Sequence, residues 1–300
     1  MKKSKKFFII LAIVLICLGL IASFSAFYAV DFDVESLYIN EHISESKTIY
    51  ENFDTVNLTA DSIDVNFVLS ENDTCKIEYS DIKQAKYDIS VNDGVLNIKR
   101  VDNRKWYEYI DILDFNNSLT VSLPKDKIKS LCINLQSGNV NAENISVFGD
   151  MDIKTQSGNV TLKNVDTKGK MNVETSSGNI KFDLCSAIGV STKTHSGNVN
   201  AENISVFGDM DIKTQSGNVT LKNVDTKGKM NIETSSGNIK FDLCSANGVS
   251  ANTHSGDVSG KFTNDMKYVA KTSSGDICVP EINSNIICEI STHSGNIIFE

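Results

Sequence analysis

The sequence contains little proline and few aromatic residues: two prolines, one tryptophan and 8% aromatic residues in a chain of 300. It is rich instead in Val, Ile, Thr, Asn and Asp, which favour strands and tight turns over helices. With 40% hydrophobic and 22% charged residues, it lacks the composition of a disordered chain. We therefore predict an all-β fold with a hydrophobic core.

The first 30 residues contain no acidic residue, and residues 7–30 contain no charge. As a helix, residues 7–30 would measure about 36 Å, more than the roughly 30 Å hydrocarbon core of a bilayer. The four lysines of the basic tail, residues 1–6, are expected to stay cytoplasmic, which places the rest of the chain outside. We predict a single-pass membrane anchor. A cleaved signal peptide is the alternative, although its apolar region would be about 7–15 residues long.

All 38 acidic residues but only 25 of the 29 basic residues follow this segment, so the exported part has a formal charge of −13. Such a charge repels nucleic acid and anionic lipid head groups. We expect no nucleic-acid partner.

A short motif, S-G-[ND], recurs along the second half of the chain. Its nine serines are spaced by 19 or 20 residues, which is the signature of a repeat architecture whose units stack on one another. Residues 137–195 and 196–254 also match at all but four of 59 positions, so a block of three repeats has been duplicated. The marker serines are Ser137, Ser157, Ser177, Ser196, Ser216, Ser236, Ser255, Ser274 and Ser294.

Apolar and polar residues alternate on both sides of each motif, as in MDIKT before it and VTL after it. A period of two on either side of a glycine turn predicts two short strands joined at the motif. Stacked repeats would then form a parallel β-solenoid of about nine coils over residues 131–300, roughly 40 Å long. Residues 31–50 are expected to be a connector and residues 51–130 an N-terminal β region that caps the first coil.

The motif residues have structural reasons of their own. We expect the glycine to adopt a positive φ, the next residue to tolerate the left-handed region, and the stacked Asn and Asp side chains to form a ladder. A threonine two residues before the marker would form a second ladder, inside the core or at the corner. The predicted turn ladder consists of Gly138, Asn139, Gly158, Asn159, Gly178, Asn179, Gly197, Asn198, Gly217, Asn218, Gly237, Asn238, Gly256, Asp257, Gly275, Asp276, Gly295 and Asn296.

The predicted cap contains two distinctive segments. Asp93-Gly94 lies between alternating runs and predicts a hairpin. Trp106 and Tyr107 belong to an aromatic group that could be a ligand-stacking patch, although covering the open first coil is the simpler role.

Several segments together resemble the bacterial putative-adhesin β-strand-repeat family. They are VNDGVLNI at Val91–Ile98, LTVSLPK at Leu119–Lys125, and the run from Ile128 into the S-G-[ND] repeats. The resemblance implies an exported, often membrane-anchored β-solenoid of unknown function, with some relatives linked to envelope-stress responses. It brings no catalytic residue with it.

Reactive side chains are present but widely spaced in the predicted fold. Cys185 and Cys244 occupy an inward apolar position and would lie three coils, about 14 Å, apart, too far for a disulfide. His195, His254 and His293 would be separated by roughly 14 Å and 10 Å, too far to share a metal ion. We expect no catalytic site, no metal site and no cofactor.

Two functions are compatible with these features: an extracellular scaffold for protein or envelope contacts, or a glycan-binding adhesin module. The sequence ends on a strand, so Ile297 and Phe299 are expected to lie on an open edge that self-associates or binds a partner strand.

Overall fold

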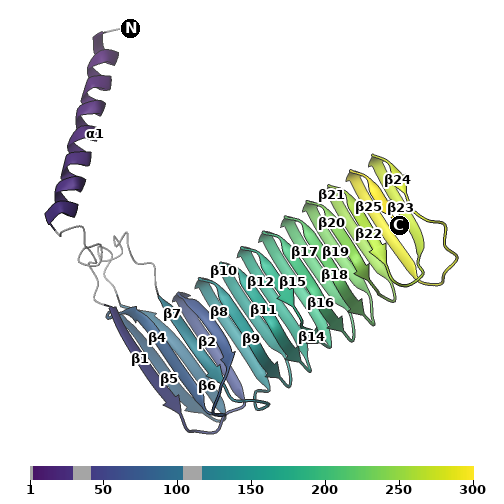
Figure 1. The fold of residues 1–300 in the computed structure, drawn as a ribbon, viewed down its shortest axis with the longest axis horizontal. Coiled ribbons are helices and arrows are strands. Elements are labelled where there is room, and N and C mark those ends of the chain that lie inside the picture. Colours follow the sequence, from purple (N-terminus) through teal and green to yellow (C-terminus); the bar gives the residue numbers. More distant parts are fainter. Residues whose placement is uncertain (1–2, 30–41, 104–116) are drawn as a thin grey trace.

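The computed structural model describes residues 3–29, 42–103 and 117–300. Helix α1 (Lys3–Ala29) is followed by strands that form two facing sheets wound into a long solenoid (Figure 1). Within α1, residues 8–25 have a mean hydropathy of 2.9, and none of this segment is buried. Its length and composition suit a membrane span, and a signal sequence would have them too.

Sheet A forms one side of the solenoid, and neighbouring coils contribute neighbouring strands. Its short strand β14 (Ser186–Ala187) pairs with both β11 and β16. From one edge to the other, the strands of sheet A are β1 (His42–Ile49), β4 (Cys75–Ile82), β7 (Ser118–Leu123), β3 (Asp64–Leu69), β9 (Val140–Val147), β11 (Val160–Thr167), β13 (Ile180–Asp183), β16 (Val199–Val206), β18 (Val219–Thr226), β20 (Ile239–Cys244), β22 (Val258–Phe262), β26 (Ile297–Phe299) and β24 (Ile277–Cys278).

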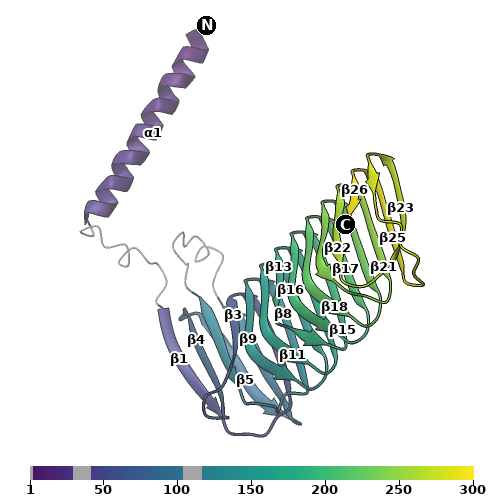
Figure 2. The same ribbon diagram turned by 45° about the vertical axis from the view of Figure 1, so that its right-hand side comes forward.

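Sheet B forms the facing side (Figure 2). From β8 onwards, each coil passes from sheet B to sheet A through an S-G-[ND] corner. From the same, N-terminal end, the strands of sheet B are β5 (Ala85–Asn92), β6 (Val95–Asp102), β2 (Thr55–Ser62), β8 (Ser130–Ser137), β10 (Met151–Ser157), β12 (Lys170–Ser177), β15 (Gly189–Ser196), β17 (Met210–Ser216), β19 (Met230–Ser236), β21 (Val249–Ser255), β25 (Ile287–Ser294) and β23 (Lys267–Ser274).

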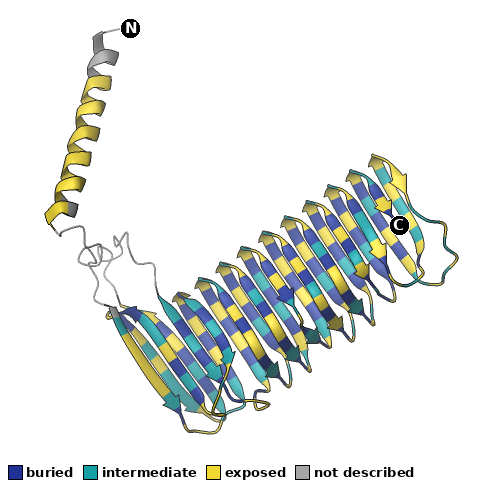
Figure 3. Cartoon of the chain, in the orientation of Figure 1, coloured by how far each residue is buried: buried dark blue, intermediate teal, exposed yellow. Residues whose placement is uncertain are grey.

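The predicted alternation produces the core between the sheets. In β10, Met151, Ile153 and Thr155 are buried, while Lys154 points outward. Parallel pairing in register stacks like on like, so Met151 lies between Leu131 and Met171. Bands of buried and exposed residues therefore run along the whole solenoid (Figure 3). The fold class predicted from the repeat is confirmed.

The solenoid begins before the first S-G-[ND] motif. Strand β2 pairs in parallel with β8, and β3 with β9, so residues 55–69 form a coil of the same kind. Strands β6 and β7 stack on this coil, also in parallel. The parallel stack thus extends into the region expected to be a cap.

Antiparallel strands close the N-terminal end. On sheet A, β4 pairs antiparallel with β7, and β1 with β4; on sheet B, β5 pairs antiparallel with β6. The β5–β6 turn has φ of 51° at Asp93 and 79° at Gly94, as a two-residue hairpin requires, so the predicted hairpin is confirmed.

A buried ion pair joins the two sheets at this end. The Arg100 Nε and Nη2 atoms of β6 donate to the Asp81 carboxylate of β4 at 2.6 and 2.9 Å, and neither side chain is more than 1% exposed. The Tyr87 hydroxyl and the Ile82 amide also donate to Asp81, at 2.6 and 2.8 Å. Burial lowers the pKa of Arg100, but the hydrogen bond and charge of Asp81 raise it more, so the guanidinium stays charged.

The last two coils are stacked in inverted order. Strand β25 pairs with β21 on one side and β23 on the other, and β26 lies between β22 and β24. The coil of residues 287–299 therefore sits on that of residues 249–262, and the earlier coil, residues 267–278, is outermost. The expectation that coils stack in chain order is wrong at this end.

Candidate binding surfaces

The S-G-[ND] corner requires glycine because successive corners stack closely. A Cβ on Gly158, Gly178 or Gly217 would lie 1.9 Å from the carbonyl oxygen of the preceding corner glycine. The predicted reason, a positive φ, holds only for Gly138, Gly158, Gly256, Gly275 and Gly295 among the nine corners. Lack of space for a side chain is the general cause.

The left-handed residues lie elsewhere in each coil than predicted. They occur seven positions after the marker serine, in the middle of the sheet A segment, and four of them are asparagines with φ of 51–57°. Leu184 and Leu243 occupy the same position with φ of 53° and are 55% and 46% exposed. The four asparagines are Asn144, Asn164, Asn203 and Asn223.

The predicted Asn ladder is present, but it joins side chains to backbone. Each side-chain Oδ1 accepts the backbone N–H of the next ladder residue, as Asn139 accepts from Asn159 at 2.9 Å and Asn159 from Asn179 at 2.8 Å. Asp64 begins the ladder by accepting the Asn139 N–H at 2.7 Å. At the other end, the Asp276 N–H donates to Asn296 at 2.9 Å.

The predicted threonine ladder lies inside the core. The Thr214 hydroxyl, for example, donates to the Gly197 carbonyl of the neighbouring coil at 3.2 Å, and the Thr234 hydroxyl does the same to Gly217. These threonines satisfy the carbonyl groups that stack at the corner. The corner is therefore internally bonded and serves the fold.

The three histidines of the T-H-S-G segments are exposed on sheet B. His254 and His293 stack face to face with ring centroids 4.9 Å apart. The predicted separation of about 10 Å is wrong, because the inverted coil order makes these coils neighbours. Within the described residues, no three His, Cys, Asp or Glu side chains are grouped so that they could hold a metal ion.

His195 lies in a shallow depression whose charged groups are balanced. Lys193 pairs with Glu174 at 3.3 Å, and Lys213 pairs with Glu233 at 3.0 Å. All four charged side chains are about half exposed or more, so these ion pairs add little stability. The depression offers no catalytic constellation.

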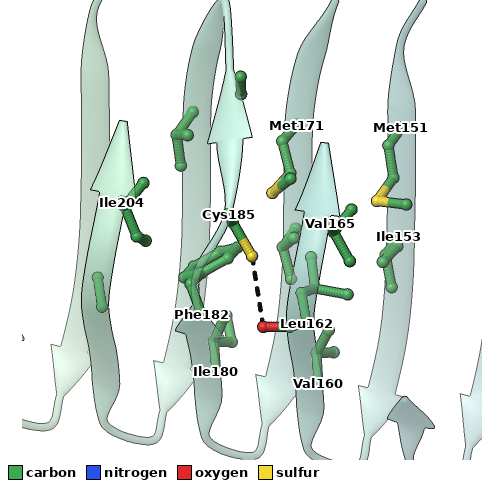
Figure 4. Close-up of a cluster of buried hydrophobic side chains, with 14 of the residues drawn as sticks. Met151, Ile153, Val160, Leu162, Val165, Met171, Ile180, Phe182, Cys185 and Ile204 are labelled. Atoms are coloured by element: carbon green, nitrogen blue, oxygen red, sulfur yellow. Dashed lines mark hydrogen bonds between the residues drawn. The ribbon is translucent and has the colours of Figure 1, made fainter. Parts of the chain in front are cut away.

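The cysteines follow the predicted orientation. Cys185 and Cys244 are buried, and the Cys185 thiol contacts the Leu162 carbonyl oxygen at 3.4 Å (Figure 4). Burial raises the pKa of both thiols. Cys132 and Cys278 are exposed.

Exposed apolar residues occur in several coils at the corner that follows the sheet A segment. Phe148, Ile188 and Phe207 are 50%, 51% and 64% exposed. Lys168 and Lys227 occupy the same position in the intervening coils, where each forms an ion pair within its own coil. Lys168 separates Phe148 from Ile188, whereas Ile188 and Phe207 lie in adjacent coils and form an exposed apolar pair. An apolar patch of this size is common on protein surfaces.

Two predicted contact residues, Trp106 and Tyr107, lie outside the described residues. The flanking strands are described: β6 ends at Asp102 on sheet B and β7 begins at Ser118 on sheet A. This coil therefore has residues 103–117 where later coils have the S-G-[ND] corner.

The other two predicted contact residues are buried, so this prediction is wrong. Ile297 is 0% and Phe299 3% exposed, because β26 lies between β22 and β24. We call the outermost coil, β23 and β24, the tip. Among the described residues, no coil lies above its inward residues: Tyr268, Ala270 and Thr272 are only half buried, and Ile277 is 46% exposed.

Two residues of the tip indicate why it is outermost. Pro280 follows β24 and lacks an N–H group, which confines proline to sheet edges. Tyr268 takes the inward position that Cys288 and Val249 hold in the next two coils, and its polar hydroxyl suits a partly open site. Both signals were visible in the sequence.

The family model for the Toastrack DUF4097 domain matches residues 53–183 and 165–299, and the chain belongs to this family. No match is found among curated proteins.

Solved structures share the architecture at low sequence identity. A putative adhesin from Parabacteroides distasonis ATCC 8503 has 14% identity and a TM-score of 0.52, over 87% of this chain and 98% of that one. A putative adhesin from Bacteroides fragilis NCTC 9343 has 15% identity and a TM-score of 0.48, over 87% and 97%. A putative lipid binding protein from P. distasonis has 14% identity and a TM-score of 0.44, over 88% and 98%.

Proposed function

We propose that the protein is a membrane-anchored extracellular rod that holds a contact surface away from the cell membrane and has no enzymatic activity. The observation that carries the proposal is the difference between the two ends of the solenoid. The chain enters at β1, which follows the apolar helix and forms one edge of sheet A, whereas the uncovered tip is at the other edge. At about 4.8 Å per strand, the solenoid separates these ends by roughly 58 Å.

The sides of the rod support a scaffold role. Outward side chains on the repeated coils are mostly polar or charged and are often bonded between adjacent coils, as in the Lys163–Glu143 and Lys222–Glu202 ion pairs. The depressions on these sides are shallow and polar, as around His195. Some relatives described as adhesins act as a precedent for contact with other molecules.

Orientation is tested by labelling intact cells with a membrane-impermeant maleimide. Cys132 and Cys278 are exposed, so both should be labelled if the solenoid is extracellular. The Cys132→Ser/Cys278→Ser variant is the matched control and should lose the label. Labelling only after the cells are permeabilised would contradict the proposed orientation.

The contact role is tested with the full chain in detergent. We expect it to be retained on isolated cell envelopes and to crosslink to protein there. Binding to a glycan array with no protein crosslink would favour the glycan-binding alternative, whereas no retention on envelopes would reject the scaffold role. A link to envelope stress predicts that deleting the gene alters the response to envelope damage.

A further inference from the structure

The tip combines two unpaired strand edges with an uncovered core. Strands β23 and β24 are the last described strands of sheets B and A. Inward residues one coil below are buried, with Cys288 0%, Ile290 2% and Ile297 0% exposed, whereas their counterparts in the tip are open. The Asn ladder also ends here, and no described donor bonds to the Asp276 carboxylate.

The N-terminal end shows how this solenoid is closed when a coil is not continued. An antiparallel strand covers the last parallel strand of each sheet: β4 on β7 in sheet A and β5 on β6 in sheet B. A partner that fits the tip therefore offers one antiparallel strand to β23 and another to β24. The distance between these two strands must match the distance between β23 and β24.

We propose that this partner is the tip of a second copy of the chain. A two-fold axis perpendicular to both sheets would place β23 antiparallel to β23 of the second copy. The same axis would place β24 antiparallel to β24 of the second copy. Such an interface is self-complementary and closed. The inference deepens the proposed contact role by naming its partner, and it joins two rods at the ends opposite their β1 strands.

The alternation of side chains determines the register. Tyr268, Ala270 and Thr272 must remain on the core side, because a shift of one residue would turn them to solvent. Among the symmetric registers with this property, we take the one that places Ala270 opposite its copy and Tyr268 opposite Thr272. A shift by two residues would instead bring Lys271 opposite Lys267 or opposite its own copy, and like charges directly opposite destabilise a strand pair. The two tyrosines then fill the space between the uncovered cores.

Charges on the outer face complement each other in this register. On one side of Val269 lies Glu289 of the same chain, which is its register partner in β25. On the other side lies Lys271 of the second copy. Val269 is 50% exposed, and both charged residues are exposed. The long side chains of Lys271 and Glu289 can meet over Val269, and symmetry makes this pair twice. Edge lysines discourage pairing with arbitrary strands, so the edge favours a partner with a carboxylate at this place.

The experiment uses the full chain in detergent micelles, reduced and then freed of the reductant, with bismaleimidoethane as a short thiol crosslinker. Cys278 is exposed on β24, the last described strand of sheet A, so its two copies would approach each other across the two-fold axis. We expect a crosslinked dimer that increases with protein concentration, disappears in Cys278→Ser and persists in Cys132→Ser.

Charge exchange makes the test specific. Lys271→Glu alone places two glutamate pairs across the interface, and Glu289→Lys alone places two lysine pairs there, so each should lower dimer yield about five- to tenfold. Mixing the two variants restores both opposite pairs and should recover the dimer, which also shows that each variant is folded. The inference is overturned if the wild type gives no dimer that depends on Cys278, if the single variants crosslink like the wild type, or if mixing fails to restore the dimer. None of these outcomes alters the cell-labelling test of orientation.

Discussion

At the scale of single residues, each position of the T-x-S-G-[ND] segment has its own physical role. The threonine satisfies a stacked carbonyl, the glycine permits two corners to touch, and the asparagine accepts the amide of the next coil. These roles differ from the expected like-with-like ladders, because the bond that recurs from coil to coil joins a side chain to the backbone of an adjacent coil.

The spatial role of glycine leads to a paired prediction. Gly217→Ala would place a Cβ 1.9 Å from the Gly197 carbonyl oxygen, whereas at Gly189 the nearest atom would be 3.5 Å away. Overpacking of this kind costs roughly 1–3 kcal/mol or more, so Gly217→Ala should lower the unfolding free energy by at least that amount. Gly189→Ala should change it by less than about 1 kcal/mol. Urea unfolding of the full chain measures both; equal losses would contradict the spatial explanation.

The threonine role gives a second matched pair. Thr214→Val leaves the buried Gly197 carbonyl without its hydroxyl donor, so we expect a loss of about 1–2 kcal/mol in unfolding free energy. The Thr192 hydroxyl is buried without a partner, and the duplicated block has Ala251 at this position. Thr192→Val should therefore be neutral or stabilising. A thermal unfolding series can rank the variants, and a larger loss at Thr192 would refute the assignment.

At the scale of elements, the two ends of the solenoid are built from different chemistry. A buried ion pair and antiparallel strands complete the N-terminal end. The tip keeps parallel strands and has apolar residues that remain partly open.

The N-terminal ion pair predicts an asymmetric response to mutation. Arg100→Met would leave the Asp81 carboxylate buried without its cation, which costs roughly 3–5 kcal/mol. Replacing both, as Asp81→Leu/Arg100→Met, removes the buried charge and should cost clearly less. Chemical denaturation of the single and double variants compares these costs. A double variant as unstable as the single one would show that packing, not charge, dominates at this end.

The tyrosines around this pair predict alkaline sensitivity. Burial, together with the nearby Glu45 carboxylate, raises the pKa of Tyr79 from 10.0 to about 12. Since the folded pKa is above the unfolded one, this stabilising contribution is complete below pH 10 and is lost as the pH rises towards 12. Tyr79→Phe removes the titrating group and should flatten the decline in thermal midpoint between pH 10 and 12. An unchanged decline would exclude Tyr79 as its source.

Much of the element pattern was predictable from the sequence, since the spacing of S-G-[ND] determines the coil length and the alternation determines which side chains face inward. Cys185 illustrates the second point, because its slot in the repeat predicted its burial. The stacking order of the last coils was not predictable from the motif, because all coils share one register and any coil can pair with any other. Only Pro280 and Tyr268 distinguish an outer coil from an inner one.

At the scale of the whole molecule, each repeated coil contacts mainly its neighbours, so length should be adjustable. Deleting residues 196–254 joins His195 to Ser255 and recreates the T-H-S-G-D sequence already present at residues 253–257. We expect a folded rod shorter by three coils, about 14 Å. Small-angle scattering measures the length and circular dichroism the strand content. Loss of folding would contradict the modular architecture.

The inverted coil order also affects how the protein is made. Residues 267–278 leave the ribosome before residues 287–299, yet the later segment must occupy the inner place. The native stack beyond β22 therefore cannot be completed until residues 287–299 have been synthesised. Pro280 and Tyr268 disfavour premature stacking of the earlier coil in that place. The outermost coil thus reaches its native partner last, although it is synthesised before that partner.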